Sequence, residues 1–158
     1  MACGGGGGGD TSSAGSLPDE ASTAGPASTA GPGGSISTQA NAVTFSGAVS
    51  GSMNVAGVTC QPASSSNIVI SMSGTVGTAQ YTVEIGAAKA GSYDLAIGTP
   101  ENVLLSQTSP FQRWGAGTFA KGTGTLIADA RSGSFVGDLE GVQGAPGKVH
   151  ADLKWTCP

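Results

Sequence analysis

The residues with the widest chemical potential in this chain are three cysteines, Cys3, Cys60 and Cys157. Cys60 stands in GVTCQP, before a Pro-Ala-Ser turn, and Cys157 stands in KWTCP near the end of the chain. A Cys60–Cys157 disulfide would close a loop of roughly 100 residues and stabilise the fold by about 4–5 kcal/mol in the chain-entropy model. Two buried free thiols are the alternative. Metal ligation is disfavoured, because no Cys-x-x-Cys pair occurs and the one histidine, His150, is expected on the opposite face of its strand from Cys157.

Cys3 has a different setting, because it lies directly ahead of six glycines in MACGGGGGGD. A lone thiol in a flexible segment is prone to oxidation unless it is modified. In bacteria, a cysteine that follows a small residue at the end of a signal peptide becomes the lipidated first residue of the mature protein. The sequence therefore predicts a lipid on Cys3 that anchors the chain to a membrane. No basic and apolar signal precedes Cys3, so we expect an export signal to have been removed or to lie upstream.

Residues that could support catalysis are few. His150 is expected on the polar face of an alternating strand, where a solvated side chain is a simpler interpretation than a general base. Asp138 and Glu140 would share one strand face, where they could hold a cation or simply face water. No G-x-S-x-G motif occurs, and GVQGAPGKV lacks the residues of a phosphate-binding loop. We predict a protein that is not an enzyme and that needs no cofactor or metal.

One segment, residues 98–122, combines aromatic and basic residues and breaks the alternation seen elsewhere. Phe111, Arg113, Trp114 and Phe119 lie in it, and they could form a ligand patch. The aromatic faces would hold a sugar or acyl chain, and Arg113 would hold an anionic group. In the alternative interpretation, the segment is a long connection folded over one open end of the domain, and its aromatic side chains fill the core.

The elements that must position these residues begin after a sharp change in composition near residue 42. Residues 1–41 are rich in Gly, Ser, Thr, Ala and Pro, repeat ASTAGP twice, and hold only Leu17 and Ile36 as large aliphatic residues. Such a segment cannot bury enough apolar surface to fold. We expect a flexible linker over 1–41 and one folded domain over 42–158.

Within 42–158, apolar and polar residues alternate with period two, which indicates half-buried strands. The clearest case is KVHADLKWTC at 148–157, where one face is apolar throughout and the other is polar. GTLIADARSGSFVGDLEGV predicts a hairpin with its turn near ARSGS. Helical periodicity is nearly absent, and PENVLLSQ at 100–107 offers at most a turn or two. Seven or eight short strands predict an all-β fold, an antiparallel β-sandwich or small barrel.

Charge and composition limit the partners. The chain has 158 residues, six basic and ten acidic side chains, and a net charge of −4, so a nucleic-acid partner is disfavoured. Only 10% of residues are charged. A low charge with many small polar residues is typical of secreted or surface β proteins.

Three stretches carry a resemblance to a known family, GVTCQPASSSNIVISMSG, GTGTLIADARSGSFVGDLEG and VHADLKWTCP. With the N-terminal cysteine and the Thr/Ala/Gly/Pro-rich linker, they resemble the small mycobacterial surface lipoprotein antigens of the nineteen-kilodalton type. The resemblance implies a Cys60–Cys157 disulfide, a lipid on Cys3, export and surface exposure, and it implies no enzymatic activity.

From these observations we expect an extracytoplasmic, membrane-anchored domain that acts in display, adhesion or interaction with the cell envelope, without catalysis. An envelope glycolipid or a host surface is the expected partner. The alternatives are a carrier or binder of an apolar or glycolipid ligand and, less favoured, an envelope hydrolase.

Overall fold

The computed structural model describes residues 41–62, 67–129 and 131–158. Twelve strands and no helix occur in these residues. The strands are β1 (Ala42–Gly47), β2 (Gly51–Ser52), β3 (Asn54–Pro62), β4 (Ile68–Val76), β5 (Ala79–Ala87), β6 (Gly91–Leu95), β7 (Asn102–Gln107), β8 (Gln112–Gly117), β9 (Ala120–Lys121), β10 (Thr123–Ala128), β11 (Ser132–Val142) and β12 (Lys148–Thr156). Over the same ranges, no helix is long and apolar enough to cross a membrane. Cys3 and the predicted linker, apart from Asn41, lie outside the described residues.

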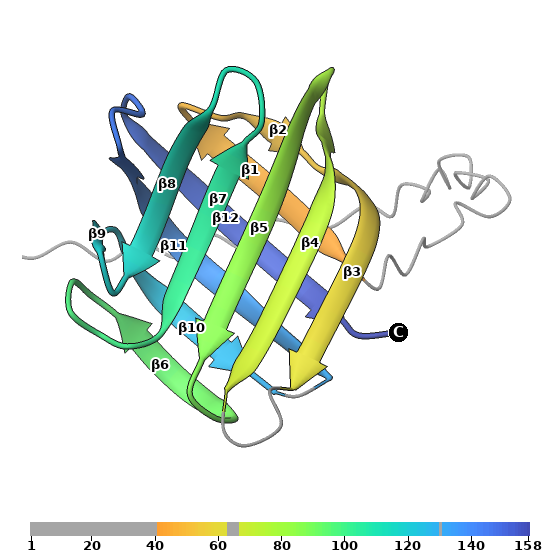
Figure 1. Cartoon of the computed structure of the whole chain (residues 1–158), viewed down its shortest axis with the longest axis vertical. Coiled ribbons are helices and arrows are strands. Elements are labelled where there is room, and N and C mark those ends of the chain that lie inside the picture. Colours follow the sequence, from red (N-terminus) through yellow and green to blue (C-terminus); the bar gives the residue numbers. More distant parts are fainter. Residues whose placement is uncertain (1–40, 63–66, 130) are drawn as a thin grey trace, which may run out of the picture. The chain divides into compact units, whose positions relative to one another are not determined.

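All named strand pairs are antiparallel, and the strands form one curved sheet in the order β2-β1-β12-β11-β8-β7-β5-β4-β3. In Figure 1, β3, β4, β5, β7 and β8 form the near layer, and β1, β12, β11, β10 and β6 cross behind them. The long β11 joins the layers because one edge pairs with β12, while the other edge pairs with β10 and then with β8. The predicted all-β fold is confirmed as a nearly closed antiparallel barrel.

The barrel closes between β3 and the β1–β12 pair without a regular ladder. Just before β3, the Met53 N–H donates a hydrogen bond to the Val43 carbonyl at 2.8 Å, which extends the β1–β2 pairing by one residue. Further along this seam a disulfide joins Cys60 in β3 to Cys157 just after β12, with the two Cα atoms 5.8 Å apart. The predicted Cys60–Cys157 pairing is therefore confirmed, and the alternative of two free thiols is wrong.

The core follows the alternation in the sequence. In β12, Val149, Ala151, Leu153 and Trp155 are buried while the residues between them are exposed. The inward side chains of β4 and β5 show the same pattern. The predicted hairpin of β10 and β11 is also present, with its turn beginning at Asp129. Ile97 lies beyond the end of β6 and is 65% exposed.

The structure of residues 98–122 differs from two of the sequence-based predictions. The stretch 100–107 is not helical, since it contains β7, and the segment as a whole is not a connection, because it supplies β7, β8 and β9 to the sheet. Val103 and Leu105 face the core and Leu104 faces outward, so the apolar run Val-Leu-Leu masks a normal strand alternation. The Gly-rich β8 shows little alternation in sequence, because a glycine has no side chain to mark its face.

Candidate functional site

The four residues predicted as a ligand patch do not form one cluster. Trp114 is a core residue, 1% exposed, and its indole N–H donates a hydrogen bond to the Pro146 carbonyl at 3.0 Å. Phe111 and Phe119 are 64% and 91% exposed, but they precede and follow β8. A six-residue strand spans about 20 Å, so the two phenylalanines flank its opposite ends. Trp114 therefore belongs to the core, as the alternative interpretation had it, and Phe111 and Phe119 do not fill the core.

A groove follows the outer face of β8, with a volume of about 380 Å³. Within β8, Gly115 pairs with Leu104 of β7 on one side and Glu140 of β11 on the other. A Cβ atom on Gly115 would lie 2.6 Å from Leu104 Cδ2 and 3.1 Å from Ala120 Cβ. Leu104 therefore leans across the position that a side chain at residue 115 would take. The lining residues are Leu104, Arg113, Phe119, Ala120, Val142 and Gln143.

Arg113 supplies the positive charge of the groove. Its Nε–H donates a hydrogen bond to Ser106 Oγ at 3.1 Å, and its guanidinium carbon lies 5.8 Å from the centre of the Phe111 ring. An Nη atom lies 3.6 Å from a carboxylate oxygen of Glu84. The guanidinium is thus held on three sides, and 32% of the Arg113 side chain is still exposed.

Two turns form the rims of the groove. The β8–β9 turn that carries Phe119 is fixed by the Thr118 hydroxyl, which lies 2.9 Å from the Thr99 carbonyl oxygen and 3.0 Å from that of Pro100. The β11–β12 turn carries Gln143 at φ 54°, followed by a glycine with positive φ. The Ala145 N–H closes this turn on the Val142 carbonyl at 3.3 Å, so Gln143 occupies the first central position of a type I′ geometry.

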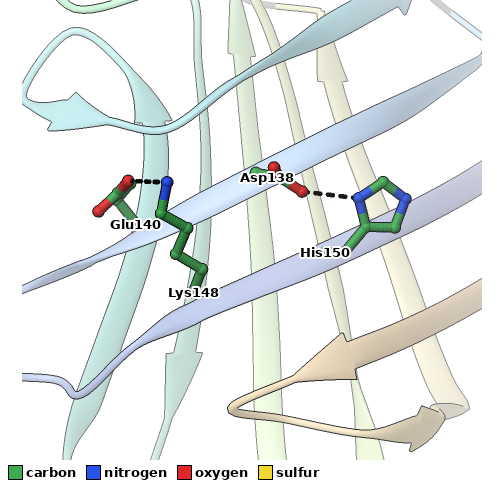
Figure 2. A network of polar contacts seen from close by, with 4 residues as sticks. All are labelled: Asp138, Glu140, Lys148 and His150. Carbon is green, nitrogen blue, oxygen red and sulfur yellow. Dashed lines mark hydrogen bonds and ion pairs between the residues drawn. The ribbon is translucent and has the colours of Figure 1, made fainter.

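A second polar surface lies beside the groove on the outer face of β11 and β12 (Figure 2). Asp138 pairs across the strands with His150, at 2.7 Å between Oδ1 and Nδ1, and Glu140 pairs with Lys148, at 2.6 Å between Oε1 and Nζ. The hydrogen bond that Lys148 donates to the Glu140 carboxylate raises the pKa of Lys148. Asp138 and Glu140 do share one strand face, and each faces a basic partner. Among the described residues, no three His, Cys, Asp or Glu side chains converge as metal ligands.

The Asp138–His150 pair also bears on catalysis, because Ser46 of β1 lies opposite His150 in the sheet register. Both members of the pair are about half exposed, at 50% and 52%, and Ser46 is exposed as well. A hydroxyl nucleophile needs a base and desolvated donors for the developing charge. Ser46, His150 and Asp138 lie in a row on this sheet face, but the face is open to solvent and does not supply the desolvated environment that such a nucleophile needs.

Comparisons of the chain with protein-family models, with curated proteins and with solved structures found no match. The resemblance to mycobacterial surface lipoprotein antigens stays a prediction. The functional argument therefore rests on the residues of this chain.

Only part of the groove was predictable from the sequence. The sequence singled out Arg113 and Phe119, but it did not identify Val142, Gln143 or the acidic neighbour Glu84 as parts of the same site. Val142 and Arg113 become neighbours only because β11 pairs with β8. One sequence signal for the groove was available. A glycine inside a strand, here Gly115, indicates that another segment approaches the strand closely.

Proposed function

We propose that this chain is an exported, non-catalytic surface domain, anchored to a membrane through a lipid on Cys3 and acting in display, adhesion or envelope interaction. The Cys60–Cys157 disulfide supports this proposal, because structural disulfides persist in oxidising, extracytoplasmic compartments. The order of the sequence, an N-terminal cysteine followed by a polar segment and then a barrel, suits a domain held away from a bilayer.

A second function, binding of an apolar or glycolipid ligand, is favoured by the groove along β8. Phe119 projects from a turn with 91% of its surface exposed, and Leu104 and Val142 line the groove beside it. Exposed apolar surface beside a fixed cation is typical of ligand sites.

The experiment for the anchor and export is the intact mass of the chain isolated from its natural host, with thiols alkylated before and after reduction. We expect a mature chain that begins at Cys3, carries added acyl mass, and exposes two further thiols only on reduction. A Cys3→Ser variant should lose the acyl mass and the membrane fraction while keeping the disulfide. An unmodified Cys3 together with free Cys60 and Cys157 would overturn both export and anchoring.

A further inference from the structure

The groove on β8 has two chemically distinct ends. One end is apolar, where Phe119 of the β8–β9 turn and Ala120 of β9 line the groove with Leu104 of β7. The other end carries the Arg113 guanidinium, with Gln143 on the opposite rim. Because β8 separates these ends along its length, a ligand that contacts both must be elongated.

We propose that this groove binds an amphiphile with a flexible apolar body and a single anionic head group. The apolar body lies over Leu104 and Val142 and against Phe119, and the head group lies at Arg113. This inference deepens the ligand-binding function proposed above, and it requires neither export nor the lipid on Cys3.

Gly115 and Phe119 create the apolar part of the groove. Gly115 brings the Leu104 side chain down onto the strand, which gives the groove an aliphatic floor in place of exposed backbone. Phe119 is the most exposed large apolar residue of the described chain, and its turn is fixed by Thr118. A ligand chain that covers Phe119 gains burial without ordering a flexible loop.

Arg113 is available to an anionic head group because its existing ion pair, with Glu84, is weak. The 3.6 Å ion pair with Glu84 involves two partly exposed side chains, and pairs of this kind contribute little free energy. Ser106 occupies the Nε–H, and arginine carries four further N–H donors in a planar fork that fits a carboxylate or phosphate. Glu84 disfavours a ligand anion, so removing its charge should strengthen binding while removing the Arg113 charge should weaken it.

The test uses the full chain with Cys3→Ser, oxidised and without lipid, and measures decanoate binding by calorimetry below the micelle concentration. Decyl maltoside, with the same apolar body and a neutral head, is the comparison ligand. We expect saturable binding of decanoate that is about tenfold or more weaker in Arg113→Gln and about twofold to fivefold tighter in Glu84→Gln. Binding of decyl maltoside should change little in either variant.

The apolar contact is tested by Phe119→Ser, which should weaken binding of both ligands by about tenfold. Matched controls are Ile127→Ser, an exposed aliphatic residue on β10, and Lys154→Gln, an exposed cation on β12. Neither control should alter binding. Glu84, Arg113 and Lys154 carry polar side chains that are at least partly exposed, and Phe119 and Ile127 are exposed. The variants are therefore expected to fold, and circular dichroism checks this.

The anion can come from a free amphiphile or from a lipid head group, and sedimentation with vesicles separates the two sources. Binding of decanoate without binding to phosphatidylglycerol vesicles indicates a free amphiphile. Arg113-dependent binding to those vesicles, and not to phosphatidylcholine vesicles, indicates a membrane lipid. The proposal would be overturned if neither decanoate nor phosphatidylglycerol vesicles bound saturably. It would also be overturned if binding were unchanged in both Arg113→Gln and Phe119→Ser. Either result would leave the anchoring proposal untouched.

Discussion

At the scale of single residues, Tyr81 shows how the barrel interior holds a polar group. The ring is 7% exposed and its centroid lies 6.4 Å from that of Phe45, while the hydroxyl donates a hydrogen bond to Gln107 Oε1 at 3.1 Å. Burial raises the pKa of Tyr81 above its ordinary value of 10.0. The folded chain therefore holds this proton more firmly than the unfolded chain does.

This shift gives a prediction for alkaline pH. A raised folded-state pKa contributes stability that is complete below pH 10.0 and is lost as the pH rises through the folded-state pKa. The raised pKa of Lys148, whose ordinary value is 10.5, acts in the same direction. Urea unfolding should show a falling midpoint above pH 10, and Tyr81→Phe should flatten that fall while costing about 1 kcal/mol at pH 7 through the lost hydrogen bond.

The measurement should be made in the Cys3→Ser background, because at high pH a free thiolate attacks disulfides. Lys148→Met separates the surface contribution from that of Tyr81. If the urea midpoint of Tyr81→Phe falls above pH 10 as steeply as that of the parent, Tyr81 is not the source of the stability lost at alkaline pH.

At the scale of elements, the β11–β12 turn keeps Gln143 at φ 54°, a conformation that costs most side chains about 1 kcal/mol or more. Asn and Gly are the favoured residues at this type I′ position. We expect Gln143→Asn or Gln143→Gly to raise the free energy of unfolding by about 0.5–1 kcal/mol, and Gln143→Val to lower it. Thermal unfolding measures the effect, and Gln80→Gly within β5 serves as the contrast, since it should destabilise. Loss of stability in Gln143→Gly would contradict the strain argument.

Gly115 in β8 gives a prediction about packing. A methyl group at this position would lie 2.6 Å from Leu104 Cδ2, so Gly115→Ala must displace Leu104 or the strand. We expect a loss of about 1–3 kcal/mol in urea unfolding. Gly57→Ala is the control, because its methyl group would meet Ser73 Oγ at an ordinary 3.5 Å. In a double-mutant cycle, Leu104→Ala should relieve part of the Gly115→Ala cost; strict additivity would mean that Leu104 does not fill the space at Gly115.

The elements also explain what sequence can predict here. β12 is predictable from its own residues, because every inward position from Val149 to Trp155 is apolar and every outward one is polar. β7 and β8 are not, since Val-Leu-Leu places apolar residues on both faces and Trp-Gly-Ala-Gly marks neither. The groove is a step further from prediction. Leu104 reaches β8 through a local hairpin, but Val142 reaches it only through the β11–β8 pairing, which joins residues far apart in the sequence.

At the scale of the whole barrel, the seam beside β3 is the part of the closure that has no regular ladder among the described strands. β3 pairs with β4 on one edge, while its other edge is joined to the end of β12 by the disulfide. Met53, just before β3, donates a hydrogen bond to the Val43 carbonyl of β1. An edge strand with unpaired backbone groups is open to fraying and to pairing with other chains. The Cys60–Cys157 bond spans 97 residues of sequence and therefore removes a large loop-closure entropy from the unfolded chain.

Removing that bond should weaken the barrel both globally and at the seam. We expect Cys60→Ser/Cys157→Ser to lose about 4–5 kcal/mol of unfolding free energy, a large share of the 5–15 kcal/mol of an ordinary domain. Hydrogen exchange should accelerate first in β3 and at the end of β12, where the seam opens, and later in β11, which is paired along both edges. Equal acceleration in β3 and β11 would mean that the disulfide acts only on the unfolded chain and that the seam is held by its packing.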